Sequence, residues 1–139
     1  MIRAVLDTNV VVSAHLEAEG REALILGLAI AGWFRSFASE ALFAEYEGVL
    51  RRAKFKFDEK RVAHWLKEMR ASMRLVKLKR KLQVTADPDD NLVLECALEA
   101  RADYVVTGNL RHFPKQFQDI RVISPKQFLT VLAAEPGML

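Results

Sequence analysis

Apolar residues occur along the chain in short, nearly continuous runs separated by longer stretches in which they recur every three or four positions. The short runs are typical of strands buried on both faces of a parallel sheet. They lie at residues 2–6, 34–38, 104–107 and 121–123, with a weaker one around 73–78. The longer stretches predict helices at residues 10–18, 21–31, 40–53, 58–71, 88–101 and 125–134. This alternation predicts an α/β fold, with a mostly parallel sheet of about five strands covered by helices.

In such folds, ligands bind outside the carboxyl ends of the strands, where the strand order reverses. The residues that directly follow the predicted strands are therefore the first candidates for a functional site. They are Asp7, Thr8, Asn9, Ser39, Thr107, Gly108 and Asn109.

The length of 139 residues predicts one domain over residues 1–139. Apolar residues make up 51% and charged residues 28%, as in ordinary globular proteins. The longest apolar run, residues 24–34, is too short to span a bilayer. Cys96 is the only cysteine, which excludes a disulfide framework and a cysteine-rich zinc site. Met1 leads straight into a predicted strand rather than a signal peptide, so we expect a cytoplasmic protein without membrane contact.

The net charge of +3 conceals an uneven distribution. Residues 51–81 carry thirteen basic and three acidic side chains, a net charge of +10, which leaves −7 for the remainder. We interpret this basic helical segment as a surface for a polyanion, or else as the solvated outer face of a helical arm. Phe55, Phe57 and Trp65 lie among its charges and either stack bases or pack into the core or a dimer interface. The residues of this segment that are candidates for contacting the polyanion are Arg51, Arg52, Lys54 and Lys56, the RNA-binding candidates if the polyanion is RNA.

The predicted helix at 88–101 begins with several acids. Asp87 can cap it, Pro88 suits its first position, and acids suit the positive end of its dipole. At about 100° per residue, Asn91, with Glu95 and Glu99, forms a polar stripe. Asp90 instead lies on the opposite, apolar side and is expected to face the protein, where a carboxylate needs a cation or several donors.

Further carboxylates occur after the first strand and in the helix at 40–53. Asp7 can serve as a helix cap or as a ligand, and periodicity alone does not choose among Glu40, Glu45 and Glu47. If Asp7, Asp90 and one glutamate converge, they need a cation to offset their repulsion. Hard oxygen ligands favour Mg²⁺ or Mn²⁺, which activates water and stabilises charge on a phosphoryl oxygen. Metal-assisted phosphodiester cleavage accounts for both the acidic cluster and the basic segment.

The motifs resemble those of PIN-domain nucleases, most closely the branch of VapC-like toxins of toxin–antitoxin systems. The residues that carry the resemblance are Val5 to Val10 with Ser13, Ala44 to Leu50 around Glu45, Asp87 to Asn91, and Ala102 to Asn109. The resemblance covers nearly the whole chain, in the order and spacing of the family. It implies a three-layer α/β/α sandwich, a site that binds Mg²⁺ or Mn²⁺, and endoribonuclease activity. It also implies a cognate antitoxin and a homodimer.

The resemblance assigns roles to individual residues. Asp7, Glu45 and Asp90 match the family's first three acids, which act in catalysis and hold the metal directly or through water. The polar residues expected to support them are Thr8, Asn9, Ser13, Thr107 and Asn109. Asn109 stands where the family usually has a fourth acid, which places binding of a second ion in doubt.

The three histidines and two alternative functions bear on this interpretation. His15, His64 and His112 share no metal-ligand spacing and are taken as non-ligands, although His112 and Arg111 lie close enough to the expected site to contact phosphate. A phosphotransferase of the haloacid dehalogenase type would need an Asp where Asn9 stands. A catalytically weakened PIN domain that only binds RNA or a partner is the remaining alternative, and Asn109 is the feature in its favour.

Overall fold

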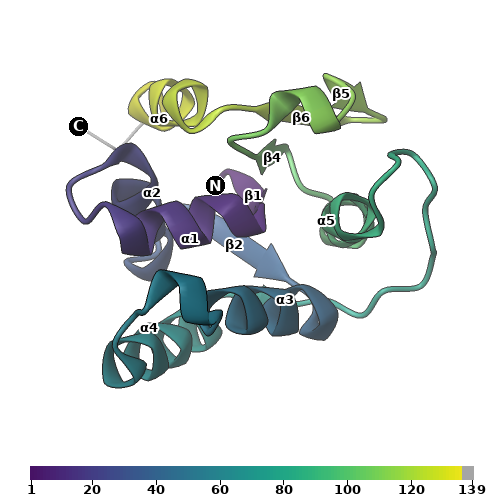
Figure 1. Ribbon diagram of the computed structural model, residues 1–139. Helices are drawn as coiled ribbons and strands as arrows, with labels where there is room; N and C mark the ends of the chain where they lie inside the picture. The colour runs from purple at the N-terminus through teal and green to yellow at the C-terminus, as the bar shows by residue number, and fades with distance from the viewer. Residues whose placement is uncertain (136–139) are drawn as a thin grey trace.

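The computed structural model describes residues 1–135 and contains a single sheet flanked by helices (Figure 1). The strands are β1 (Arg3–Leu6), β2 (Arg35–Ala38), β3 (Arg74–Leu75), β4 (Tyr104–Val106), β5 (Gln116–Phe117) and β6 (Ile120–Ile123). The α-helices are α1 (Thr8–Leu16), α2 (Arg21–Ile30), α3 (Glu40–Leu50), α4 (Glu59–Ser72), α5 (Pro88–Ala100) and α6 (Pro125–Ala133). Two short 3₁₀ helices are η1 (Ala53–Phe55) and η2 (Leu110–His112).

The sheet has the strand order β3-β2-β1-β4-β6-β5. All neighbouring strands pair in parallel except β5 and β6, which form an antiparallel hairpin. The sheet is therefore mostly parallel, as predicted, but it has six strands rather than about five. The additional strand, β5, is two residues long, and its hairpin turns through Gln118, which has a positive φ of 53°.

Helices cover both faces of this sheet, which confirms the α/β/α sandwich. Helix α5 packs against β1, β2 and β4 on one face, while α1 and α2 lie on the other, with α6 against α2 (Figure 1). Helix α3 packs against α1 and β2, and α4 packs against α2. The chain thus moves outward in one direction from β1 to β2, and after the crossover through α5 it moves in the other direction from β4 to β6. The strand order reverses between β1 and β4.

Side-chain caps determine where most of the helices begin. The side chains of Asp7, Ser39, Asp58, Asp87 and Ser124 accept hydrogen bonds from backbone N–H groups in the first turns of α1, α3, α4, α5 and α6. In α6 the cap is reciprocal, because the Gln127 side chain also accepts from the Ser124 backbone. These caps fix the ends of the helices that follow β1 and precede β4, where the candidate residues lie.

The apolar residues of the sheet and of the inner helix faces form a continuous core. The fully buried rings of Phe34 and Phe128 meet edge to face at 4.9 Å and join α6 to the segment before β2. Cys96, Met69 and Met73 are buried in the core. The Cys96 thiol has its pKa raised to about 12 by burial, so it is an inert thiol.

The basic segment at 51–81 contains the predicted helix as α4 and the weaker predicted strand as β3, and residues 76–86 then follow an irregular path along the outside of α5 (Figure 1). Asn91, which belongs to the predicted polar stripe of α5, is buried because this irregular segment covers it. Within residues 1–135, no helix has the length and apolar character needed to cross a membrane.

Candidate active site

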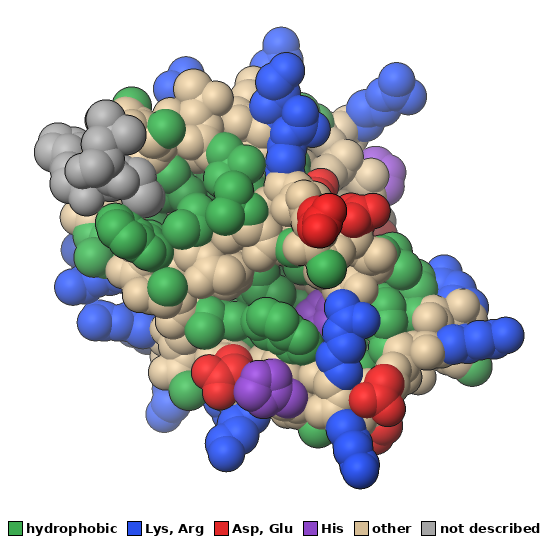
Figure 2. Space-filling model, turned by 90° about the vertical axis from the view of Figure 1, so that its left-hand side faces the viewer, with side chains coloured by type: hydrophobic (Ala, Val, Ile, Leu, Met, Phe, Trp, Pro, Cys, Tyr) green, Lys and Arg blue, Asp and Glu red, His purple; other side chains and the backbone are tan. Residues whose placement is uncertain are grey.

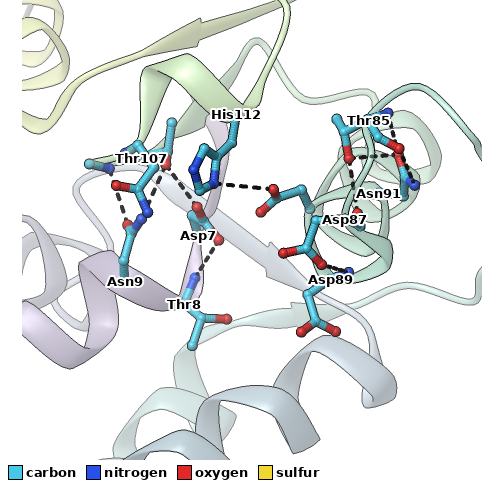
Figure 3. A network of polar contacts seen from close by, with 12 residues as sticks. Asp7, Thr8, Asn9, Thr85, Asp87, Asp89, Asn91, Thr107 and His112 are labelled. Atoms are coloured by element: carbon cyan, nitrogen blue, oxygen red, sulfur yellow. Dashed lines mark hydrogen bonds and ion pairs between the residues drawn. The ribbon is translucent and has the colours of Figure 1, made fainter.

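The hydrogen-bond ladder of the sheet continues to the first residues after β1 and β4. The Asp7 N–H donates to the Val106 carbonyl at 2.9 Å, and the Thr107 N–H donates to the Ile123 carbonyl at 3.0 Å. Asp7 and Thr107 thus extend from neighbouring strands at the place where the strand order reverses. Their side chains meet there, as the position of ligand sites in open α/β folds predicts (Figure 3).

The Asp7 carboxylate is held by donors on two sides. One oxygen accepts from the Thr8 N–H at 2.8 Å, and the other accepts from the Thr107 hydroxyl at 2.7 Å (Figure 3). The Thr107 oxygen in turn accepts from the Asn109 N–H at 2.9 Å and from the Asn9 amide at 3.4 Å. Because its acceptor capacity is filled by these two donors, the hydroxyl proton is directed at Asp7.

Asn9 links the first turn of α1 to the loop after β4. Its side-chain oxygen accepts from the Gly108 N–H at 3.1 Å, so the carboxamide contacts both Gly108 and Thr107. Ser13 lies one turn further along the same face of α1 and is half-buried. Four of the predicted supporting residues therefore contact Asp7 or one another, namely Thr8, Asn9, Thr107 and, through its backbone, Asn109.

Asp90 lies at the N-terminal end of α5 with only 8% of its surface exposed, which agrees with the prediction that it faces inward. One of its carboxylate oxygens is 3.5 Å from Nδ1 of His112, which η2 brings over the site (Figure 3). Asp87 caps α5 by accepting from the Asp89 N–H at 2.8 Å, as expected. The first turn of α5 thus places three carboxylates beside the end of β1.

The neighbouring Asn91 fixes this turn to the segment before it. Its side-chain oxygen accepts from the Val84 N–H, the Thr85 N–H and the Thr85 hydroxyl, and its amide donates to the Thr85 carbonyl (Figure 3). Glu95, one turn later, accepts from the Leu82 N–H at 2.9 Å. These bonds hold residues 82–85 against α5 and so fix the position of the chain just before the cap residue Asp87 and the first turn that contains Asp90.

Helix α3 supplies the remaining candidate acid. Glu45 is half-buried and its carboxyl group interacts with that of Asp89. The exposed Glu40 instead pairs with Arg70, and the half-buried Glu47 pairs with Arg51. The neighbouring Tyr46 is fully buried and donates from its hydroxyl to the Leu6 carbonyl. This contact ties α3 to the end of β1, one residue before Asp7.

The carboxyl groups titrate above their ordinary range because they are withdrawn from water and lie near one another. Burial is the main cause of the raised pKa of Asp7, against which the Thr107 and Thr8 donors act. Burial and then the charges of Asp7 and Asp87 raise the pKa of Asp90 to about 6. Burial and then Asp89 raise the pKa of Glu45 to about 7. A cation among these groups would lower all three values.

The donor set suits a hard divalent cation. Asp7, Asp90 and Glu45 offer carboxylate oxygens, the ligand type that Mg²⁺ and Mn²⁺ prefer. Among the residues that the structure describes, no three His, Cys, Asp or Glu side chains already form a cage around one point. Since Mg²⁺ usually keeps several waters and takes one or two carboxylates, ligation by Asp7 and Asp90 with water is compatible with this arrangement.

The basic candidates differ in their availability. Arg51 forms ion pairs with Glu47 and with Glu59, the latter at 2.8 Å, so its guanidinium is engaged within the protein. Arg52 is exposed and lies close enough to Glu45 to lower the pKa of that group. Lys54 lies over the ring of Phe55 at 5.0 Å, and Lys56 is exposed. Arg111 is exposed on η2, beside His112.

His112, expected near the site but not as a metal ligand, lies against Asp90. The sequence did not predict the role of one further acid. Asp89 was interpreted as a dipole-stabilising acid, but it also faces Glu45. His15, in contrast, is buried and its ring contacts those of Phe57 and Trp65 rather than the acids of the site. Those two rings pack against the core, as one of their two interpretations predicted.

Comparison with known families agrees with this geometry. A family model described as PIN domain matches residues 3–111, which include β1 to β4, Arg111 and the site acids Asp7, Glu45, Asp87, Asp89 and Asp90. A search of curated proteins finds none that matches the chain.

Proposed function

Because the chain belongs to the PIN-domain family, whose members are in general metal-dependent nucleases, we propose that it is an endoribonuclease that uses Mg²⁺ or Mn²⁺ and acts as the toxin of a toxin–antitoxin pair. The observation that carries the proposal is the convergence of buried Asp7 and Asp90 at the point where the strand order reverses. Both carboxyl groups are buried at the same edge of the sheet, and burial is the main cause that raises the pKa of each, as is common at functional sites.

In this proposal, Asp7 and Asp90 hold the ion, directly or through water. When bound, the ion supplies positive charge that favours ionisation of a water molecule and stabilises charge on the phosphoryl oxygens. Glu45 orients the attacking water and accepts its proton, because it approaches from α3, on a different element from the two ligands. Water attacks phosphorus, the P–O bond to the 3′ oxygen breaks as the new P–O bond forms, and the leaving 3′ oxygen takes a proton from solvent.

The surrounding polar residues keep Asp7 in place for this role. Thr8 and Thr107 each donate to a different carboxylate oxygen, which fixes the plane of the carboxylate. Asn9 and the backbone of Asn109 hold the Thr107 hydroxyl in turn. Asn109 and Ser13 contribute neutral oxygen atoms, so in this proposal they adjust water and substrate rather than adding charge.

We propose RNA as the substrate and an antitoxin and a second copy of the chain as partners. Arg52, Lys54, Lys56 and Arg111 are exposed cations that suit contacts to phosphate. For the homodimer, the face on the left of Figure 1 exposes apolar side chains where α1, α2 and α6 meet (Figure 2). Leu16 and Leu24 are 57% and 54% exposed in this region. Light scattering of Leu24→Glu against the parent protein tests the dimer, because a charge at a shared apolar face would yield a monomer.

The decisive experiment compares Asp7→Asn and Asp90→Asn with the parent protein on a panel of RNAs with Mg²⁺, Mn²⁺ or EDTA. Both variants keep the side-chain shape, so they should fold and bind RNA while losing metal-dependent cleavage by at least about 100-fold, as expected when a group acting on the transition state is removed. Glu99→Gln, on the far end of α5, is the matched control for loss of one acid. Full activity in either Asn variant refutes the proposal.

The second candidate function is a PIN domain that binds RNA or a partner without cleavage. Asn109 favours it, because a neutral side chain stands where the family usually has an acid. Retention of Asp7, Glu45 and Asp90 argues against it. Binding that is unaffected by EDTA, together with no cleavage of any RNA in the panel, would establish this alternative.

A further inference from the structure

A groove adjoins the candidate site on the side away from α3 and the basic segment. It begins at Asn109 and His112 and runs between η2 and the first turns of α2 and α6. Its wall contains the residues that follow β4 and those that follow β6, so it lies at the carboxyl edge of the sheet, beside the reversal in strand order. Ligands of open α/β sheets bind along this edge.

The groove carries an excess of positive charge drawn from three separate segments. Arg21 comes from the start of α2, Arg111 from η2 and Lys126 from the first turn of α6, against one acid, Glu22. Among residues 1–135, none of these three cations forms an ion pair. They differ in this respect from Arg51, whose charge is neutralised by two glutamates.

A second groove provides a comparison. It lies at the opposite, amino edge of the sheet, where Lys79, Arg80 and Arg101 are matched by Glu99, Asp103 and Asp119. Its charges cancel and it is remote from Asp7, so nothing about it favours a polyanion. The groove at the active-site edge, in contrast, carries three cations against one acid.

We propose that the groove lined by Arg21, Arg111 and Lys126 holds the RNA backbone on one side of the scissile phosphodiester. The inference rests on the proposed nuclease function and adds a binding site for the RNA backbone beside the scissile phosphate. A strand whose scissile phosphate lies at Asp7 and Asp90 passes His112 and then meets the three cations, whose charge pairs with successive phosphates. Arg52 and Lys54 lie on the other side of the site, beside α3, so the backbone would enter along one side and leave along the other.

The test measures binding of a fluorescein-labelled single-stranded RNA of 12 nucleotides by fluorescence anisotropy, in the Asp7→Asn background that prevents cleavage. Arg21→Gln and Lys126→Gln should each raise Kd by about three- to tenfold at low salt and lower the salt slope by roughly 0.7 to 1, the value for one phosphate contact. Arg35→Gln, at the amino end of β2, is the matched control and should change Kd by less than about twofold, as expected of a charge outside the phosphate contacts.

Steady-state kinetics in the active protein give a second measurement. Arg21→Gln and Lys126→Gln should raise KM for RNA and leave kcat unchanged, because they hold substrate and transition state equally. Unaltered Kd and KM in the variant that combines both substitutions, in a protein that still binds and cleaves RNA, would overturn the groove and leave the nuclease function standing. A second outcome would also overturn the groove as an RNA site: a peptide of twelve aspartates binds in a way that depends on Arg21 and Lys126, whereas RNA binding does not depend on them. The groove would then be a site for an acidic protein tail. Absence of cleavage and RNA binding in the parent protein would instead refute the proposed function itself.

Discussion

Replacing Thr107 by valine isolates the contribution of one hydroxyl group to the site. Valine has nearly the same shape, and Thr107 is completely buried, so the substitution removes hydrogen bonds without leaving a cavity. The Asp7 carboxylate loses one of its two donors, and the Asn109 N–H and the Asn9 amide lose their acceptor. Because Asn109 is exposed and Asn9 is half-buried, water can satisfy these two donors. The buried group left unsatisfied is the carboxylate of Asp7.

The magnitude follows from this accounting. A hydrogen bond to a charged group contributes about 1.5–3 kcal/mol, so Thr107→Val should lower the free energy of unfolding by about 2 kcal/mol at pH 8. With a urea m-value of about 2 kcal/mol/M, the midpoint should fall by about 1 M. Thr107→Ser keeps the hydroxyl and loses one methyl group, which costs about 0.8 kcal/mol. The two variants therefore separate the hydrogen bond from packing.

The same pair of variants tests whether the hydroxyl serves the site as well as the fold. Removal of a donor to the ionised form raises the pKa of Asp7 further, so binding of Mn²⁺ to Thr107→Val should shift to higher pH, and binding to Thr107→Ser should not. Isothermal titration with Mn²⁺ between pH 6 and pH 8 measures this shift. Thr130→Val, on the exposed face of α6, is the control and should change stability by less than about 0.5 kcal/mol. Equal stability and equal Mn²⁺ binding in Thr107→Val and the parent protein would refute the reasoning.

Three further outcomes follow from other contacts. Asn91→Ala removes four hydrogen bonds to Val84 and Thr85, so it should cost about 1–3 kcal/mol in urea unfolding and speed hydrogen exchange at residues 84–87; unchanged exchange there would contradict it. Burial and the nearby Arg61 lower the pKa of His15, so His15 binds a proton more readily in the unfolded chain, and the free energy of unfolding falls as pH drops below about 6.5. His15→Phe should lose less stability than the parent protein between pH 7.5 and pH 5.5. Equal losses in the two proteins would exclude His15 as the cause. Arg52→Gln should weaken RNA binding alike for all sequences and lower the salt slope by roughly 0.7, and a sequence-dependent loss would point to base contacts instead.

The fold was largely predictable because its strands and helices bury one face or both. Hydrophobic periodicity reports that burial directly, and all six predicted helices occur within a few residues of their expected ends. The strand at Gln116–Phe117 was missed because two residues carry no period, and pairing with β6 alone makes it a strand. The weaker strand predicted around 73–78 is present only at Arg74–Leu75, and the apolar side chains of Val76, Leu78 and Leu82 anchor the irregular segment that follows it to the core.

Within the site, the sequence predicted which side of a helix faces inward but not what covers the other side. Asp90 could be placed because its neighbours on the helix surface are apolar. The same calculation placed Asn91 in a polar stripe, yet Asn91 is buried, because residues 82–85 lie over it. Helical periodicity predicts on which side of one helix a residue lies, but it does not predict whether another segment of the chain covers that side. The contact between His112 and Asp90 depends on the same kind of tertiary closure.

The distribution of charge shows the same limit in a form that bears on function. Counting along the chain assigned the positive surface to residues 51–81, but Glu40 and Glu47, outside that segment, pair with two of its arginines. The cations of the groove beside the site come from positions 21, 111 and 126, which no window of sequence contains together. Parallel strands carry their carboxyl ends to one edge, so residues that follow different strands, or begin the helices after them, meet there. In an α/β nuclease, net charge should therefore be counted over the residues that follow the β-strands or begin the next helices. The sheet edge that binds the scissile phosphate also brings together the side chains that lie nearest to the neighbouring phosphates of the nucleic acid.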